Sequence, residues 1–199
     1  ENGELFGEEY TLVAVADYLL QRRPGHVVSN LSSSRALRDI AERHRSTYSA
    51  SAVGEVHVVT EMKAREAVLG GEGNGGIILP ELHYGRDALV GVALFLTYLA
   101  KKGGTCSALR ATYPNYAMAK EKIDLQPGVD TDALLVRVAA AHAHLNPSTI
   151  DGVKIDFADR WVHLRKSNTE PIVRIYTEAP TEAEAAALAS EFVAKLASL

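Results

Sequence analysis

Residues 165–171 read Arg-Lys-Ser-Asn-Thr-Glu-Pro, a composition that suits a loop binding a phosphate group. The planar guanidinium of Arg165 can form paired hydrogen bonds with an anion. Ser167 and Thr169 add hydroxyl donors, and Asn168 adds an amide NH2. Backbone N–H groups of such a loop can also converge on an anion if the loop curls. The residue types therefore predict a small anion site.

A second arginine, Arg174, lies on the strand expected to follow this loop. It alternates with Val173 and Ile175, so we expect its side chain to point away from the core. Arg174 is thus a further candidate for phosphate binding. Since Ser, Asn and Thr are also common turn residues, a polar turn with two solvated arginines remains an alternative.

Residues 70–76 read Gly-Gly-Glu-Gly-Asn-Gly-Gly, with five glycines in seven positions. Glycine lets backbone approach a ligand closely. Glu72 offers an acceptor and Asn74 offers both a donor and an acceptor, a set suited to neighbouring sugar hydroxyls. No Lys-Ser or Lys-Thr follows, which argues against a nucleotide-binding loop. A flexible surface loop is the alternative reading.

Composition excludes several other classes of function. The chain has 199 residues and a formal charge of −4, so a broad nucleic-acid surface is not expected. The longest apolar stretch, 88–100, is short of the roughly 20 residues that a membrane span needs, and it predicts a buried helix instead. The single Cys106 cannot form an internal disulfide, which suits a reducing cytoplasm. The seven histidines form no recognisable metal-binding pattern.

The first half of the chain alternates helices and strands. We expect helices at 11–23, capped by Thr11, and at 35–45, 61–69 and 87–102, and strands at 26–31, 54–59 and 77–79. This rhythm predicts a three-layer α/β domain over residues 10–113, with a mixed, mostly parallel sheet. Residues 1–9 open on Asn-Gly, a turn signal, and read as a linker or the remnant of a preceding domain. A processed or tag-cleaved terminus is the alternative.

The second half has a different pattern. Residues 113–116 suggest a hinge, and strands are expected at 116–125, 153–157, 161–165 and 172–178, with helices at 130–142 and 181–199. Thr181 and Glu184 have the spacing of a capping box. The pattern predicts a small α+β domain over 114–199, in which two helices pack an antiparallel sheet.

Together the two motifs resemble those of the phosphohexose mutase family, which includes phosphomannomutases, phosphoglucomutases and phosphoglucosamine mutases. Residues 165–171 match its fourth-domain loop, Arg-x-Ser-Gly/Asn-Thr-Glu-Pro, and residues 71–75 match its third-domain sugar loop, Gly-Glu-x-Ser/Asn-Gly. Segments 29–34 and 53–55 also look like family segments. The similarity covers nearly the whole chain in the family's order. It implies the C-terminal half of such an enzyme, its third and fourth domains.

The resemblance also implies a function and a set of site residues. The full-length protein would move phosphate between C1 and C6 of a hexose phosphate. In this chain, the α/β domain would recognise the sugar and the α+β domain would hold the phosphate that is not reacting. No catalytic or metal-binding residue is expected here; the expected phosphate-binding residues are Arg165, Ser167, Asn168, Thr169 and Arg174, and the expected sugar-binding residues are Glu72, Asn74, Glu55 and Ser32. An ordinary surface role remains open for Glu55 and Ser32.

Two family features are absent from the sequence: the phosphoserine segment and the Asp-rich magnesium loop. The resemblance therefore implies that Mg2+ binds elsewhere in the full-length enzyme and that this chain alone is inactive. Its implied partners are a hexose phosphate or bisphosphate and the missing N-terminal domains, with no nucleic acid and no membrane, in the cytoplasm. Many members carry His after the sugar loop where this chain has Gly76, so the sugar identity stays open. The rival is a free-standing phosphosugar-binding module without catalysis.

Overall fold

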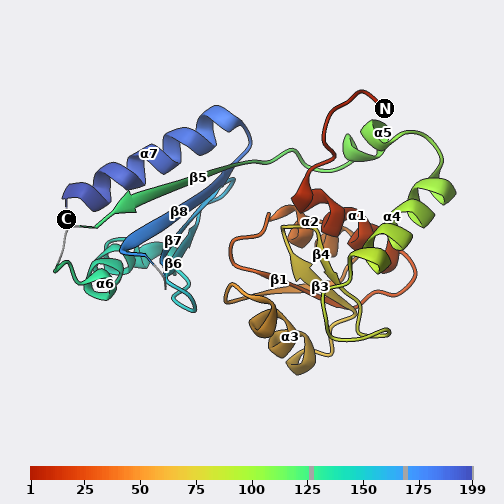
Figure 1. Cartoon of the computed structure of the whole chain (residues 1–199), viewed down its shortest axis with the longest axis horizontal. Helices are drawn as coiled ribbons and strands as arrows, with labels where there is room; N and C mark the ends of the chain where they lie inside the picture. Colours follow the sequence, from red (N-terminus) through yellow and green to blue (C-terminus); the bar gives the residue numbers. More distant parts are fainter. Residues whose placement is uncertain (126–127, 168–169, 199) are drawn as a thin grey trace. The chain divides into compact units, whose positions relative to one another are not determined.

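The computed structural model describes residues 1–125, 128–167 and 170–198 and divides into two units, Glu1–Pro114 and Asn115–Leu199 (Figure 1). Each unit has its own sheet and its own core, and the two are described separately below. Among the described residues, no helix is both long and apolar enough to cross a membrane.

The first unit is built around a four-stranded sheet with the order β2-β1-β3-β4. β1 is parallel to both β2 and β3, while β4 is antiparallel to β3. The predicted mixed, mostly parallel sheet is therefore confirmed. Its elements are α1 (Glu8–Leu20), β1 (His26–Asn30), α2 (Ala36–Arg43), β2 (Thr47–Ser51), α3 (Glu55–Ala64), β3 (Leu69–Glu72), β4 (Gly76–Ile78), α4 (Ala88–Lys102) and α5 (Cys106–Arg110).

Two neighbouring glycines of β3 show how helices cover both faces of this sheet. Successive strand residues face opposite sides. A Cβ added at Gly70 would run into Met62 of α3, whereas one added at Gly71 would lie 3.2 Å from Leu12 Cδ1 of α1. Figure 1 shows the same arrangement, with α3 below the sheet and α1 and α2 above it. The three-layer architecture is confirmed.

Several local predictions for this unit were wrong. Residues 54–59 are not a strand, because the chain enters α3 at Glu55. Val58 and Met62, four residues apart, are fully buried while Val56 is 75% exposed, which is helical spacing rather than strand alternation. The helix ends at Ala64, so of the helix expected over 61–69 only residues 61–64 are helical.

The glycine-rich run is mostly strand rather than loop. It forms the end of β3 and the start of β4, and only residues 73–75 turn the chain between them. Gly75 has φ +80°, a value that glycine adopts without strain. β2 was not predicted at all, because Thr47–Ser51 lacks an apolar run. The structure explains this composition, since the first four residues of the strand are not fully buried.

Two further predictions about helices need correction. α1 begins at Glu8 after Gly7, so Thr11 lies inside the helix instead of capping it. α4 is capped by Asp87 as expected, through Asp87 Oδ1 and the backbone N–H of Val90. It is not a buried helix, however: only Gly91 and Tyr98 are buried, and Leu89 is 81% exposed.

A buried carboxylate fastens four segments of this unit together. Asp17 of α1 accepts hydrogen bonds from the hydroxyls of Tyr98, at 2.6 Å, and Tyr113, at 3.1 Å, and lies 2.6 Å from His44 Nε2. Burial alone would raise the pKa of Asp17, but these hydrogen bonds outweigh it, so the pKa lies below its usual value. Sequence spacing did not reveal this contact.

The second unit is a four-stranded antiparallel sheet with the order β5-β8-β7-β6. Its elements are β5 (Ala117–Asp124), α6 (Thr131–Ala141), the 3-10 turn η1 (Ala143–Leu145), β6 (Val153–Asp156), β7 (Trp161–Lys166), β8 (Ile172–Ala179) and α7 (Glu182–Ser198). One core joins α6 and α7 to a single face of the sheet. The predicted antiparallel sheet packed by two helices is confirmed.

Thr181 caps the start of α7 as predicted, but Glu184 bonds the Thr181 hydroxyl rather than its backbone N–H, so the capping box forms only in part. The backbone N–H of Glu184 donates to Thr181 Oγ1 at 3.2 Å, and the Thr181 hydroxyl donates to the Glu184 carboxylate at 2.8 Å. Such a cap satisfies a helix N–H that has no partner within the helix.

Candidate functional site

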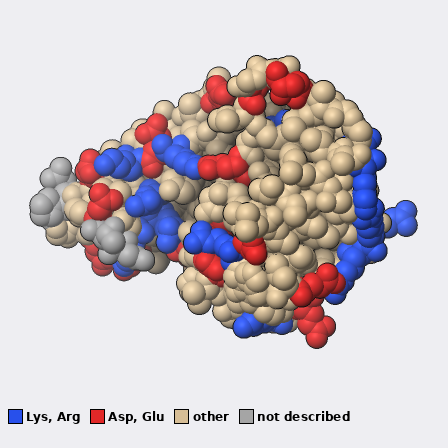
Figure 2. Space-filling view, turned by 45° about the vertical axis from the view of Figure 1, so that its right-hand side comes forward, with Lys and Arg blue, Asp and Glu red and all other residues tan. Residues whose placement is uncertain are grey.

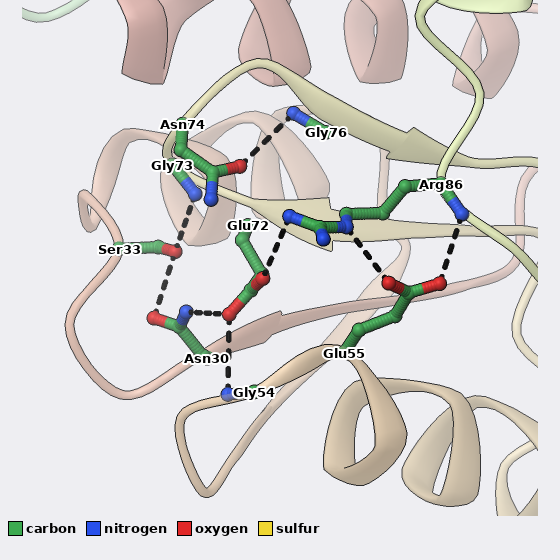
Figure 3. A network of polar contacts seen from close by, with 9 residues as sticks. All are labelled: Asn30, Ser33, Gly54, Glu55, Glu72, Gly73, Asn74, Gly76 and Arg86. Atoms are coloured by element: carbon green, nitrogen blue, oxygen red, sulfur yellow. Dashed lines mark hydrogen bonds and ion pairs between the residues drawn. The ribbon is translucent and has the colours of Figure 1, made fainter.

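The candidate sugar site lies at the carboxyl edge of the first sheet. Asn30, Ser51 and Glu72 are the last residues of the parallel strands β1, β2 and β3. β1 connects through α2 to β2 on one side, and the chain then crosses through α3 to β3 on the other side of β1. Open α/β sheets bind ligands where such connections diverge. Asn30 and Glu72 meet at that point (Figure 3).

Glu72 is held there by donors from two other segments. Its Oε1 accepts hydrogen bonds from Asn30 Nδ2, at 2.7 Å, and from the backbone N–H of Gly54, at 3.1 Å. Its Oε2 lies 3.8 Å from Arg86 Nη1. The residue is only 7% exposed. A carboxylate this buried requires such partners, so its position is set by the fold.

Arg86 bridges the two carboxylates of the site (Figure 3). Its Nε donates to Glu55 Oε2 at 2.8 Å, and its backbone N–H donates to Glu55 Oε1 at 3.1 Å. The backbone bond and the guanidinium together hold the pKa of Glu55 below its usual value. Gly76 makes room for this arginine, since a Cβ there would lie 2.8 Å from Arg86 Cδ.

Ser33 extends the network to the glycine turn, where Asn74 also lies (Figure 3). The Ser33 hydroxyl donates to Asn30 Oδ1 at 3.0 Å and accepts from the backbone N–H of Gly73 at 2.9 Å. Asn74 Oδ1 accepts from the Gly76 N–H at 3.2 Å. Ser32, in contrast, reaches the network through its backbone, with its N–H donating to Asn30 Oδ1 at 2.9 Å.

The structure thus joins Glu72 and Glu55 in one network through Arg86, with Ser32 at its margin. Asn74 lies at the neighbouring glycine turn and accepts from the Gly76 N–H there, not from a member of the network. Three members were missed from the sequence: Asn30, Ser33 and Arg86. Asn30 and Ser33 lie within the segment 29–34 that carries part of the family resemblance, which was a usable signal. Arg86 had no signal beyond its position before the α4 cap, Asp87.

The candidate phosphate site lies at the β7–β8 turn of the second unit. The turn is closed by the N–H of Ser167, which donates to the Ile172 carbonyl at 3.0 Å. Arg165 and Arg174 face each other across the two strands. Arg165 Nε donates to Asp151 Oδ2 at 2.9 Å, and this contact orients the guanidinium.

The side chain of Arg174 points away from the core, as predicted, while Val173 and Ile175 on either side of it are fully buried. The structure therefore brings Arg165, Ser167 and Arg174 to one end of the sheet. Asn168 and Thr169, the other two predicted phosphate-binding residues, lie outside the described residues.

The described part of the chain holds no group of three or more His, Cys, Asp or Glu residues placed to bind a metal ion. The groups that converge at the two candidate sites are donors from arginines, hydroxyls and amides, together with the acceptor carboxylates of Glu55 and Glu72. This set suits an anion and sugar hydroxyls better than a divalent cation, because a cation takes oxygen ligands and the arginines offer only N–H donors.

Comparison with known proteins assigns both units to one family. The family model for phosphoglucomutase/phosphomannomutase alpha/beta/alpha domain III matches residues 7–116, and the model for the C-terminal domain of the same family matches residues 120–195. The chain belongs to the phosphoglucomutase/phosphomannomutase family. The resemblance inferred from the two motifs is confirmed by these matches.

Individual relatives agree with this assignment. The chain is 31% identical to a probable phosphoglucosamine mutase of Methanopyrus kandleri, over 97% of this chain and 43% of that protein. It is 35% identical to a phosphoglucomutase/phosphomannomutase of Thermococcus kodakarensis, over 93% of this chain and 41% of that protein. The chain therefore spans less than half the length of these relatives.

Solved structures confirm the fold of the chain. A phosphoglucomutase/phosphomannomutase family protein from Burkholderia thailandensis superposes with a TM-score of 0.76 at 23% identity, over 96% of this chain and 41% of that one. A putative phosphomannomutase from Thermus thermophilus gives a TM-score of 0.71 at 25% identity, over 98% of this chain and 41% of that one.

Proposed function

We propose that this chain is the sugar- and phosphate-binding part of a phosphohexose mutase of the phosphomannomutase or phosphoglucosamine mutase type. The full protein would move phosphate between C1 and C6 of a hexose phosphate. The observation that carries the proposal is the buried Glu72 carboxylate, fastened by Asn30 and Gly54 at the divergence point of the first sheet. Membership in the phosphoglucomutase/phosphomannomutase family supports it.

Each unit would contribute a different part of substrate binding. Glu72, Glu55 and Asn74 would bind sugar hydroxyls, because fixed acceptors and an amide next to a glycine turn match that chemistry. Ser32 would lie at the edge of this site. The fixed carboxylates of Glu72 and Glu55 would orient the sugar. Contacts of this kind assist catalysis without touching the reacting atoms.

The second unit would clamp the phosphate that is not reacting. Arg165 and Arg174 supply the positive charge, and Ser167, Asn168 and Thr169 would supply neutral donors by their place in the motif. Charge-assisted hydrogen bonds of this kind contribute about 1.5–3 kcal/mol each. A mutase that accepts its substrate in two orientations needs such a site, since either phosphate can be the idle one.

The phosphoserine and the Mg2+ used by the full enzyme would lie in preceding domains of the same protein. The chain's span of 43% and 41% of two relatives supports this proposal. Mg2+ would there stabilise the charge of the phosphoryl group in transfer. A cytoplasmic location belongs to the same proposal and suits the free Cys106 thiol.

An NMR titration of the chain with glucose 6-phosphate tests the binding role. We expect amide shifts at residues 71–75 and at residues 167–169. A titration that shifts neither residues 71–75 nor residues 167–169 would refute the proposal. Shifts at 167–169 alone would refute the sugar site.

Activity assays separate catalysis from simple binding. We expect no turnover of glucose 1-phosphate by this chain alone, and measurable turnover would contradict the assignment of the chemistry to other domains. The full-length protein should convert one or more of the 1-phosphates of glucose, mannose and glucosamine. A full-length protein that binds them without turnover would instead be a phosphosugar-binding module without catalysis.

A further inference from the structure

Three cationic side chains form one row across the sheet of the second unit. Strand pairing sets Lys122 of β5 opposite Arg174 of β8, and Arg174 opposite Arg165 of β7. Directly paired residues project from the same face of a sheet. Val173 and Ile175 belong to the core formed with α6 and α7, so the row projects from the other face.

The charges in this row are only partly compensated. Like charges directly opposite each other on a sheet are destabilising. Arg165 has a close partner in Asp151, at 2.9 Å. Arg174 Nη2 lies 3.8 Å from Glu170 Oε2, and these side chains are 39% and 53% exposed, so that pair is weak.

Lys122 is the least compensated member of the row. It is exposed, and no carboxylate in the described part of the chain forms an ion pair with its ammonium. A residue that destabilises the fold and makes no stabilising contact is a candidate for a functional residue. An anion bound over the row would convert the mutual repulsion into attraction.

The surface beside the row is hollowed. Lys122 and Arg174 line a shallow hollow of about 390 Å³ together with Lys120, Tyr176, Glu121 and Glu170. The Lys120 ammonium lies 5.8 Å from the centre of the Tyr176 ring. Figure 2 shows Lys and Arg side chains gathered on this smaller unit with acidic ones beside them. The hollow is large enough for a phosphate group with part of a sugar.

We propose that Lys122 is a further phosphate-binding residue, so that a phosphate monoester dianion lies over the row beside the β7–β8 turn. This inference rests on the proposed phosphate site and extends it to β5. Arg165 and Arg174 belong to the recognised motif region, whereas Lys122 lies 43 positions before Arg165 in the sequence and no motif marks it. The dianion would contact Lys122 and Arg174 from the hollow.

Titration with inorganic phosphate at low ionic strength tests the proposal, using Lys122→Gln. A unit charge about 5 Å from a dianion contributes about 1.7 kcal/mol even at the dielectric constant of water, so we expect the Kd to rise about tenfold or more. Lys195→Gln is the matched control. Lys195 lies on α7, packed on the opposite face, and pairs with Glu191 at 2.7 Å. Its removal should leave the Kd within about twofold.

Thermal unfolding without ligand supplies a second readout. A lysine with a merely structural role would lower the unfolding temperature when replaced. Lys122→Gln should leave it unchanged or raise it, because a repulsive charge is removed. A lowered unfolding temperature together with an unchanged Kd overturns the inference.

The remaining outcomes separate this inference from the proposed function. If Arg165→Gln abolishes phosphate binding and Lys122→Gln does not weaken it, the phosphate site stands and the role of Lys122 is refuted. If Lys195→Gln weakens binding as much as Lys122→Gln, the effect is general electrostatics and the inference is again refuted. If the unmodified chain does not bind phosphate, both proposals fail.

Discussion

Replacing Glu72 by Gln removes the charge of the candidate sugar site while preserving its shape. Both donors that hold Glu72 bond the same oxygen, Oε1. A glutamine that places its carbonyl oxygen there keeps the bonds from Asn30 and Gly54. Its NH2 then takes the place of Oε2, the atom that lies nearest Arg86 and that we propose accepts a sugar hydroxyl.

The cost to folding follows from these contacts. The pair with Arg86 is long, at 3.8 Å, and Arg86 is 47% exposed, so its loss costs about 0–1 kcal/mol. The two retained hydrogen bonds lose the benefit of a charged acceptor, about 1 kcal/mol in total. We expect Glu72→Gln to lower the free energy of unfolding by about 1–2 kcal/mol. Glu72→Ala would leave both donors without an acceptor and should cost about 3 kcal/mol or more.

The cost to sugar binding should be larger. A hydroxyl that donates to a carboxylate contributes about 1.5–3 kcal/mol, so Glu72→Gln should weaken the sugar contact about tenfold to a hundredfold. NMR titration with glucose 6-phosphate measures this at residues 71–75. The Ser167 amide serves as an internal control, because phosphate binding in the second unit should persist.

Two results would refute this reasoning. Unchanged affinity at residues 71–75 in Glu72→Gln would show that the carboxylate does not contact the sugar. A loss of stability as large as that of Glu72→Ala would show that the glutamine does not reproduce the bonds to Asn30 and Gly54.

Three other perturbations test separate parts of the structure. Burial lowers the pKa of His163 from 6.5 to about 4, so its contribution to stability is complete above about pH 6.5 and is lost as pH falls toward 4. The loss should reach about 3 kcal/mol in urea unfolding, and His163→Gln should abolish that pH dependence; an unchanged dependence would exclude His163 as its source. Gly71→Ala should destabilise the first unit by about 2–3 kcal/mol, because the new Cβ would collide with the backbone oxygen of Gly76, and a loss below about 0.5 kcal/mol in the same assay would contradict this. Arg86→Met should raise the pKa of Glu55, because its guanidinium is removed while its backbone N–H remains; an unshifted carboxyl titration by carbon-13 NMR would show that the guanidinium contact is not made in solution.

The fold of the second unit was predicted almost completely from its sequence. Strand alternation at Val153 and Ile155, the spacing of Leu134 and Val138, and the Thr181 helix cap are local patterns, and each was confirmed. The strand pairs β6–β7 and β7–β8 are joined by short connections, so local patterns predict them, whereas the pairing of β5 with β8 comes from distant parts of the sequence.

The first unit was harder to predict because its strands are short and lie at the centre of the domain. Residues 55–59 alternate like a strand but form a helix, since Val58 and Met62 pack on the sheet only when the chain is helical. The glycine run hid β3, because glycine has low strand propensity, whereas β4 overlaps the strand expected at 77–79. Its glycines are needed for close packing of Gly70 against Met62.

The candidate sites were also predicted only in part from the sequence. The residue types and their order determined the two motifs, the family resemblance and the choice of Glu72, Asn74, Arg165 and Arg174. The sequence also sets the formal charge of −4, which argues against a broad nucleic-acid surface.

Only the tertiary structure decided which groups meet. Asn30 and Glu72 are 42 positions apart, and they touch because β1 and β3 are neighbours in the sheet. Arg86 reaches Glu55 from 31 positions away, and Lys122 lies beside Arg174 through strand pairing. Crossover connections and strand register set such contacts. Neither leaves a periodic trace in the sequence, because the free energy that selects them comes from packing of the whole unit.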